Sequence, residues 1–300
     1  MKVTILGNNS ALPAFGRHPT AQAVTVYGEH ILLDCGEGTQ IQMQRYGIRW
    51  RNLQHIFISH MHGDHYFGLP GLINSMSLLG RTAPLHVYAP VAMQDIMDII
   101  QNVAQTVLCF PYHFHPLPEG AATLIDTEAF SVKCFPVNHR IHCHGFVIER
   151  KTKGRKLIPD KAREYEIPAA FYDRLKQGED YERKDGMLVK NEWVTEDGPS
   201  PKKYAYCADT LFTDSFIEHI RDVDTIYHEC TYLHADVIKA EARFHSTARQ
   251  AAELAKLANA KQLLLGHFSS KYKDLDPFRQ EAAEIFPNVF ATIEGTAYEI

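Results

Sequence analysis

The sequence predicts an α/β fold in which two mixed β-sheets form the centre and helices cover the outside. Apolar, β-branched runs of strand length alternate with segments that show helical spacing of apolar residues. Strand-rich stretches lie at both ends of the chain, at residues 1–35 and 288–300, and favour two mixed sheets over one doubly wound sheet. A charged stretch at 150–203 interrupts this pattern and predicts an inserted, protruding arm.

Four of the predicted strands end directly before a histidine or an aspartate. The strand runs and the residues that follow them are 54–59 before His60, 130–138 before His139, 204–208 before Asp209 and 262–266 before His267. Ligands of open α/β sheets bind beyond the carboxyl ends of the strands. We therefore expect these four side chains to meet at one shared site.

Helical patterns lie between the predicted strands. We expect helices at 68–80, at 91–105, from a Ser246 or Thr247 cap to about Asn259, and from Pro277 to Phe286. Within the arm, short helices are expected at 160–166 and at 168–177, the second of them ended by Gly178.

Length and composition are those of an ordinary globular protein. The chain has 300 residues, 45% hydrophobic and 22% charged, and we expect a single domain over residues 1–300 that carries the arm. The net charge of −5 means that any RNA binding must come from local basic patches.

The six cysteines are scattered and predict reduced thiols. No apolar run has membrane-spanning length or resembles a signal peptide, so we expect a cytoplasmic protein without a membrane partner.

The start of the arm is strongly basic. Residues 150–163 contain seven Lys or Arg and one acidic residue, Asp160. This charge fits contacts with the phosphates of a nucleic acid. Charge alone is equally compatible with a solvated surface excursion or a disordered loop.

The central motif is His60-Met61-His62-Gly63-Asp64-His65, on the turn after a predicted strand. Neutral imidazole and carboxylate are ligands that suit zinc, and Gly63 permits the unusual backbone angles of a tight turn. Counting ligands gives two ions per chain that share Asp209 as a bridge. The first ion takes His60, His62 and His139, and the second takes Asp64, His65 and His267. The nearby Cys207 could be a soft ligand, but it fits a core thiol better because the ligand set is already complete.

The histidine motif, followed by a distant His, Asp and His, resembles the metallo-β-lactamase superfamily. Further motifs resemble the ribonuclease Z family, in order and in spacing, over nearly the whole chain except much of residues 178–203. These motifs are Asp34-Cys35-Gly36-Glu37-Gly38-Thr39-Gln40, Phe67-Gly68-Leu69-Pro70-Gly71-Leu72, Ser77-Leu78-Leu79-Gly80-Arg81, Cys207-Ala208-Asp209-Thr210, His228-Glu229-Cys230-Thr231, Phe244-His245-Ser246-Thr247 and Gly266-His267-Phe268-Ser269-Ser270-Lys271-Tyr272.

The resemblance implies a four-layer αββα sandwich and an enzyme that removes the 3′ trailer from precursor tRNA, leaving a 3′-hydroxyl on the tRNA. It also implies a homodimer in which the arm of one subunit grips the tRNA that the other subunit cuts. The arm residues expected to bind substrate are Lys151, Lys153, Arg155 and Lys156. Residues 167–171, Ile-Pro-Ala-Ala-Phe, depart from the Gly/Pro-rich stretch that the family often has at this place.

The chemistry implied by the resemblance is hydrolysis of a phosphodiester. Two zinc ions would lower the pKa of a shared water molecule to give a nucleophile at neutral pH. Asp64 would act as the general base or orient the nucleophile. His245, just ahead of a predicted helix, is the candidate proton donor to the departing 3′-oxygen, with Glu229 as its partner. On sequence alone His245 could also be a capping or surface residue, and His113, His115, His142, His144 and His228 are expected to be structural.

Three alternatives remain open at this point. The same fold could hydrolyse another substrate, such as a β-lactam, a thioester, a sulfate ester or a cyclic-nucleotide phosphodiester. The chain could be a non-catalytic RNA-binding relative, although such proteins often lose ligands. A zinc-stabilised structural protein is the third, but structural sites are closed by four protein ligands, and this sequence offers seven for two ions.

Overall fold

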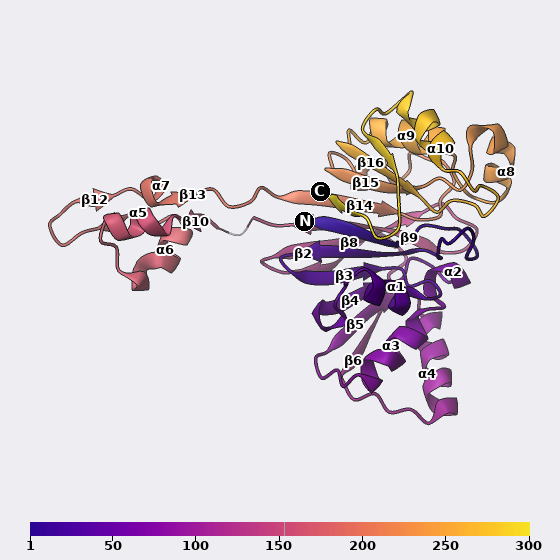
Figure 1. The fold of residues 1–300 in the computed structure, drawn as a ribbon, viewed down its shortest axis with the longest axis horizontal. Helices are drawn as coiled ribbons and strands as arrows, with labels where there is room; N and C mark the ends of the chain where they lie inside the picture. Colours follow the sequence, from indigo (N-terminus) through magenta and orange to yellow (C-terminus); the bar gives the residue numbers. More distant parts are fainter. Residues whose placement is uncertain (153) are drawn as a thin grey trace.

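Two seven-stranded mixed sheets form the centre of the computed structural model, which describes residues 1–152 and 154–300 (Figure 1). The strands of the first sheet, in spatial order, are β18 (Ala297–Glu299), β1 (Lys2–Gly7), β2 (Ala21–Val26), β3 (Glu29–Leu33), β4 (Leu53–Phe57), β5 (Leu85–Ala89) and β6 (Tyr112–Pro116). Those of the second sheet are β17 (Val289–Ala291), β16 (Gln262–Gly266), β15 (Thr225–Glu229), β14 (Lys202–Cys207), β9 (Cys143–Arg150), β8 (Phe130–Val137) and β7 (Ala122–Asp126).

Each sheet is antiparallel in one half and parallel in the other. In the first sheet β3, β4, β5 and β6 run parallel, and in the second β14, β15, β16 and β17 do. The parallel strands of a sheet deliver the residues that follow them to the same edge. This arrangement brings the ends of β4, β14 and β16 to one end of the molecule.

Side chains alternate along the strands between a core shared by the two sheets and a layer covered by helices. At the end of β4, Phe57 packs between the two sheets. Its neighbours in sequence, Ile56 and Ile58, pack under the helices. The first sheet is covered by α1 (Thr39–Arg45), α3 (Leu69–Leu78) and α4 (Ala92–Ala104), and the second by α9 (Ala248–Leu257) and α10 (Asp276–Ala283). The result is the αββα sandwich expected from the sequence.

Shorter helical turns connect these layers. They are η1 (Trp50–Asn52), α2 (Gly63–Tyr66), η3 (Ile217–His219), η4 (His234–Asp236) and α8 (Val237–Ala242). Of the two caps expected for α9, Thr247 is the one used: it accepts a hydrogen bond from Gln250 N, and the Gln250 side chain accepts one from Thr247 N. The last long helix begins at Asp276, one residue before the expected start, and ends at Ala283, three residues before the expected end at Phe286.

The arm extends away from the sandwich and lies between β9 and β14 in the chain (Figure 1). Its elements are β10 (Lys156–Leu157), α5 (Pro159–Glu164), η2 (Ala169–Phe171), α6 (Tyr172–Lys176), β11 (Tyr181–Glu182), β12 (Leu188–Val189), α7 (Asn191–Val194) and β13 (Thr195–Glu196). Ile167, Leu175, Val189 and Val194 form a small core of their own. The described part of the arm is therefore a folded unit and not the disordered loop that its charge also allowed.

Among residues 1–152 and 154–300, no helix combines the length and the hydropathy that a bilayer crossing requires.

Candidate metal centre

The turn after β4 carries the histidine motif and leads into α2. The backbone N–H of Ser59 donates to Asp34 Oδ1 at 2.7 Å, and the Ser59 hydroxyl donates to Asp34 Oδ2 at 2.9 Å, which fixes the end of the strand. Gly63 does not have a positive φ, so the structure does not bear out the unusual backbone angles that we expected of it. A Cβ at this position would lie 2.2 Å from the ring of Phe67, so a larger residue would displace that ring.

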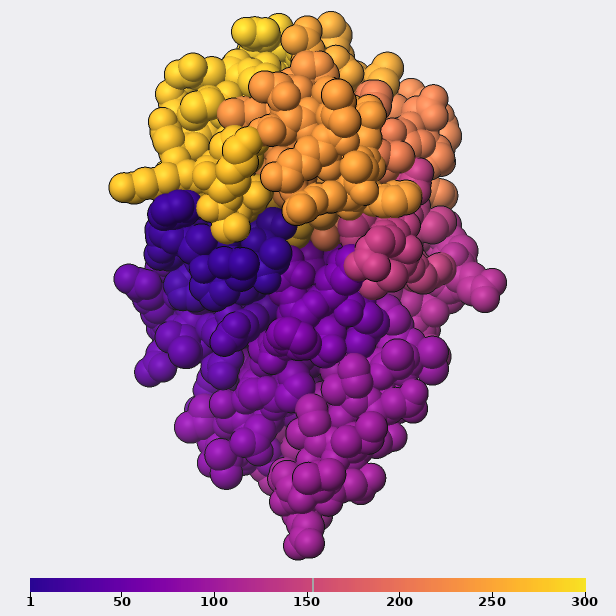
Figure 2. Space-filling model, turned by 90° about the vertical axis from the view of Figure 1, so that its right-hand side faces the viewer, coloured from indigo at the N-terminus to yellow at the C-terminus, as the bar shows by residue number. Residues whose placement is uncertain are grey.

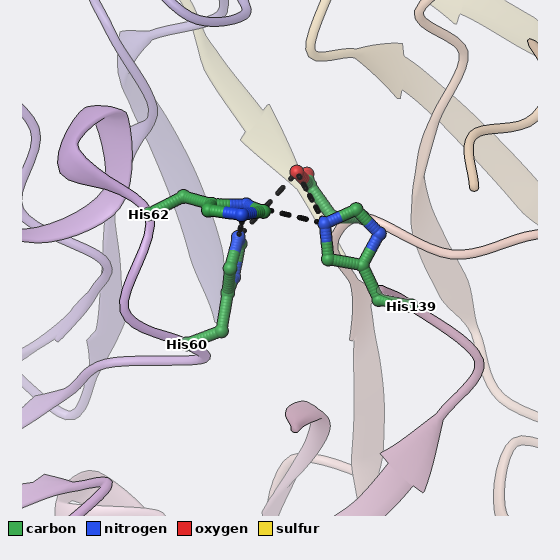
Figure 3. A group of neighbouring side chains, drawn as sticks. His60, His62 and His139 are labelled. Carbon is green, nitrogen blue, oxygen red and sulfur yellow. Dashed lines mark hydrogen bonds and ion pairs between the residues drawn. The ribbon is translucent and has the colours of Figure 1, made fainter. Parts of the chain in front are cut away.

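The first group of candidate ligands consists of His60, His62, His139 and Asp209, whose donor atoms all lie within 4.8 Å of one another. Figure 3 shows the three imidazoles pointing toward a common centre. His62 Nδ1 lies 2.9 Å from His60 Nε2 and 3.2 Å from His139 Nε2. Asp209 Oδ2 lies 3.5 Å from His60 Nε2.

The second group consists of Asp64, His65 and His267, again within 4.8 Å. Asp64 Oδ2 is 3.4 Å from His267 Nε2 and 3.6 Å from His65 Nε2. Asp209 Oδ1 faces the same two nitrogens, at 3.0 Å from His267 and 3.4 Å from His65. Each oxygen of Asp209 therefore faces one group, as expected of a carboxylate that bridges two ions.

The protonation of the first group suits a cation. Burial and the neighbouring imidazoles lower the pKa of His60 well below its usual value and that of His62 to about 4, so both rings are neutral at pH 7. In the second group, burial would lower the pKa of His65, but Asp209, Asp64 and Asp34 raise it well above its usual value. Burial would raise the pKa of Asp209, but His267 and His65 hold it well below the usual range. Asp209 Oδ1 is buried and has no hydrogen-bond partner among the described residues. Neutral imidazoles around an ionised carboxylate are the donor set that zinc takes.

His65 is held in place from behind by Asp34. Asp34 Oδ2 lies 2.7 Å from His65 Nδ1 and accepts a hydrogen bond from the Tyr206 hydroxyl at 2.5 Å. Asp34 itself is fully buried and has a left-handed backbone with φ of +55°. A carboxylate on the outer nitrogen fixes the tautomer and the orientation of a metal-binding histidine. Sequence reasoning missed Asp34 in this role.

A second buried carboxylate, Glu229 at the end of β15, holds His245. His245 Nδ1 lies 2.8 Å from Glu229 Oε1 and 3.2 Å from the Thr231 hydroxyl. Thr231 also donates to Glu229 Oε2 at 2.8 Å and lies 2.9 Å from His267 Nδ1, so it connects this pair to the second ligand group. Burial would lower the pKa of His245, but Glu229 raises it to about 9. The carboxylate of Glu229 therefore favours the protonated form of His245 beside the candidate ligands.

All seven expected ligands and both expected helpers thus meet in one place, and five of them (His62, Asp64, Asp209, His245 and His267) line a cavity of about 340 Å³. Figure 2 views this end of the molecule, where indigo, purple and orange segments from distant parts of the chain meet. The cavity wall consists of Ser10, Ala11, His62, Gly63, Asp64, Phe67, Asp209, His245 and His267. Cys207 lies outside both ligand groups, buried in the core beneath the second layer of helices.

Arg140 is a further charged residue that sequence reasoning missed. Its Nη2 lies 2.8 Å from His62 Nε2, and no carboxylate within 4.0 Å pairs with it among the described residues. A guanidinium beside such a centre can form charge-assisted hydrogen bonds with an anionic group. The only sequence signal was its position directly after His139.

The basic arm residues lie far from this cavity and already have acidic neighbours. Lys151 pairs with Asp126, and Lys156 Nζ lies 2.7 Å from Glu196 Oε1. Arg155 donates to the Thr195 hydroxyl at 2.7 Å and to Asp197 Oδ1 at 2.6 Å. Lys153, also expected to bind substrate, lies outside the described residues.

Known protein families and individual proteins resemble this chain over different lengths. Residues 1–153 match the family model described as Anti-Pycsar protein Apyc1. Over nearly the full length, the chain is 39% identical to a ribonuclease Z of Parabacteroides distasonis across 294 residues, which cover 98% of this chain and 97% of the relative. It is 38% identical to a ribonuclease Z of Cytophaga hutchinsonii across 298 residues, covering 99% and 95%.

Solved structures agree with the sequence comparison. The short form of human tRNase Z superposes with a TM-score of 0.73 at 27% identity, covering 100% of this chain and 99% of that one. The metallo-β-lactamase-fold protein YhfI of Bacillus subtilis superposes with a TM-score of 0.68 at 20% identity, covering 99% and 98%. The fold expected from the sequence is thereby confirmed.

Proposed function

Because this chain belongs to the ribonuclease Z family, we propose that it is an endoribonuclease that removes the 3′ trailer from precursor tRNA. The observation that carries the proposal is the pairing of two ligand groups around Asp209 in a chain that matches ribonuclease Z over nearly its full length. The family model that covers residues 1–153 spans only about half of the chain, whereas the ribonuclease Z relatives also span the arm and the segments that carry Asp209, Glu229, His245 and His267.

We further propose that the two ligand groups hold two zinc ions. Three histidines and a shared aspartate can hold the first, and Asp64, His65, His267 and the same aspartate can hold the second. When bound, such a pair of ions activates a water molecule at neutral pH and neutralises the charge of the scissile phosphate.

The protein's own residues then handle the protons. Asp64 orients the attacking water and accepts its proton, and its Oδ2 is fixed by a hydrogen bond of 2.7 Å from the backbone N–H of Ala11. The water oxygen forms the new bond to phosphorus as the bond to the 3′-oxygen breaks. His245, kept cationic by Glu229, donates a proton to that 3′-oxygen. The products are a tRNA with a 3′-hydroxyl and a trailer with a 5′-phosphate.

The proposed activity is tested with a panel of substrates. We expect the zinc-loaded protein to cut a precursor tRNA once, at the 3′ end of the tRNA body, and to leave nitrocefin and a glutathione thioester intact. End mapping of the products by gel electrophoresis identifies the bond that is cut. Hydrolysis of another ester with intact RNA would contradict the proposal, and binding of tRNA without turnover would favour the non-catalytic alternative.

The arm is proposed to bind the tRNA through its basic residues. Arg155 and Lys156 each carry a carboxylate neighbour, so their charge is partly masked. Neutralising the two cations (Arg155→Gln with Lys156→Gln) should weaken tRNA cleavage about tenfold. The slope of the logarithm of the tRNA-binding constant against the logarithm of the salt concentration should also become less steep, by about one for each phosphate that the arm no longer neutralises.

The matched control neutralises the acidic partners instead, with Asp197→Asn and Glu196→Gln. If the cations contact phosphate, this control removes competition and strengthens tRNA binding, because surface ion pairs add little stability of their own. Filter binding at several salt concentrations distinguishes the two results. Equal weakening by both pairs of substitutions would mean that these residues only support the structure of the arm.

We also propose that the protein is a homodimer that acts in the cytoplasm. The described cysteines are all unpaired, as in a reducing compartment. Large apolar side chains gather on α3, on α4 and just after them, each at least 60% exposed: Leu78, Leu79, Ile99, Val103 and Val107. The hydrogen bond of 3.1 Å from Cys109 N to the Ser77 hydroxyl ties the end of α3 to the segment that follows α4. Exposed apolar side chains gathered in this way support a protein–protein interface, which we propose to lie between two copies of the chain.

Introducing charge into this surface should separate the subunits. We expect Val103→Glu with Val107→Glu to give a monomer, because a dimer would bury two unpaired carboxylates per chain. Sedimentation equilibrium measures the mass directly. Ile238→Glu is the control, since Ile238 on α8 is as exposed as Val103 and lies on the other helical layer. A wild-type protein that sediments as a monomer would contradict the proposal.

A further inference from the structure

We propose that Phe67 is a stacking platform for one unpaired nucleotide of the RNA next to the scissile phosphate. The inference rests on the proposed function, because it requires a substrate with nucleobases. Phe67 is the residue that follows α2 and has no place among the ligands or the proton donors. It lies in the wall of the catalytic cavity beside His62, Gly63 and Asp64.

The ring of Phe67 packs on neighbouring residues of the turn although it is exposed. Its backbone N–H donates to Gly63 O at 2.9 Å, and its ring packs over Gly63, where any Cβ would collide with it at 2.2 Å. The ring of Tyr66 meets it edge-on, with centroids 4.9 Å apart. Even so, Phe67 is 60% exposed. One side of the ring is thus supported by the metal-binding turn, while much of it remains open to a ligand.

Phe67 places an exposed apolar ring at the wall of a cavity whose other residues are polar or small. Apart from its histidines, the described wall of that cavity offers no other aromatic ring. A flat apolar ring beside a phosphodiester centre is what an unstacked base requires, because proteins bind single-stranded RNA by stacking bases on aromatic side chains.

The nucleotides beside a cut between tRNA and trailer are single-stranded, so their bases are free to leave the helical stack. Stacking one of them on Phe67 would fix the backbone next to it against the ligand groups. Such positioning makes attack on one chosen phosphate effectively intramolecular. Phe67 would then act as a positioning residue that selects the linkage to be cut.

The test compares Phe67→Leu and Phe67→Trp with the wild-type protein. Leucine keeps apolar bulk but offers no ring, whereas tryptophan offers a larger one. Stacking contributes about 1–3 kcal/mol per base, and each 1.4 kcal/mol corresponds to tenfold. We therefore expect Phe67→Leu to lower kcat/KM for precursor tRNA about tenfold more than for bis(p-nitrophenyl) phosphate, and Phe67→Trp to retain it. Phe290→Leu, an exposed phenylalanine on β17, is the control that leaves both activities unchanged.

A direct readout uses 2-aminopurine placed on either side of the scissile linkage, in a precursor made uncleavable at that linkage. Binding to the wild-type protein should quench the fluorescence at one of the two positions, and binding to Phe67→Leu should not. Equal quenching by both proteins, or no quenching at either position, would overturn the inference. If the wild-type protein leaves the cleavable precursor intact, the proposed function fails instead.

Discussion

Asp209→Ala is expected to lose both metal ions and to cut precursor tRNA at least ~10³-fold more slowly than the wild-type protein. The reason is that each oxygen of Asp209 faces a different ligand group, at 3.5 Å from His60 Nε2 and at 3.0 Å from His267 Nε2. Losing this one carboxylate removes a ligand from both ions and the negative charge that balances them. Several kcal/mol of charge stabilisation by such ions correspond to three or more powers of ten in rate.

The measurement combines metal analysis of dialysed protein with thermal unfolding in the presence and absence of zinc. Zinc should stabilise the wild-type protein by mass action and leave Asp209→Ala unaffected. Asp214→Ala removes an exposed carboxylate five residues away and serves as the control. Retention of two ions by Asp209→Ala would show that the bridge has been assigned to the wrong residue.

His245→Ala is expected to reduce the rate about 10²- to 10⁴-fold, the usual contribution of a general acid. The expected defect depends on the leaving group. In a precursor with sulfur in place of the 3′-bridging oxygen, the departing thiolate needs little help from a proton donor, because thiols ionise near pH 8.5. His245→Ala should therefore cut this precursor almost as well as the wild-type protein does. His219→Ala, an exposed histidine on η3, is the control.

Glu229→Gln tests the same pair through its pH dependence. Glu229 raises the pKa of His245 above its ordinary value, to about 9, and so keeps the ring protonated at neutral pH. Removing the carboxylate lowers that pKa, so the protonated fraction falls at a lower pH. The alkaline limb of the pH–rate profile should consequently move to lower pH. If His245→Ala instead loses the same factor in rate on the oxygen and sulfur precursors, His245 is a structural residue or a metal ligand.

That the candidate ligands meet in one place could be predicted because it depends on local features of the sequence. His60 and His267 each follow an apolar run of strand length, and strands of one sheet end at one edge. The motif from His60 to His65 lies within six residues, so its chemistry did not depend on knowing the fold.

Residues that position the ligands were harder to find, because their partners are distant in sequence. Asp34 meets His65 and Tyr206 across separations of 31 and 172 residues. A signal was nevertheless present, since Asp34 also follows an apolar strand, β3, as the ligands do. Thr231 and Arg140 gave no comparable signal, because single hydroxyls and surface arginines occur throughout soluble proteins.

The arm shows a different limit. Its charge predicted an insertion but not its internal structure, because strands of two residues leave no alternation to read. Its core is assembled from Ile167, Leu175, Val189 and Val194, which are scattered among charged residues. Likewise, the sequence shows that position 63 is glycine, but only the structure shows that a side chain at this position would meet the ring of Phe67.

Anomalous diffraction at the zinc absorption edge, from crystals of the zinc-loaded protein, tests the two-metal centre most directly. We expect two peaks per chain, one among His60, His62 and His139 and the other among Asp64, His65 and His267, with Asp209 between them. A single peak closed by four protein ligands, or peaks away from these side chains, would contradict the two-metal centre and the proposed chemistry with it.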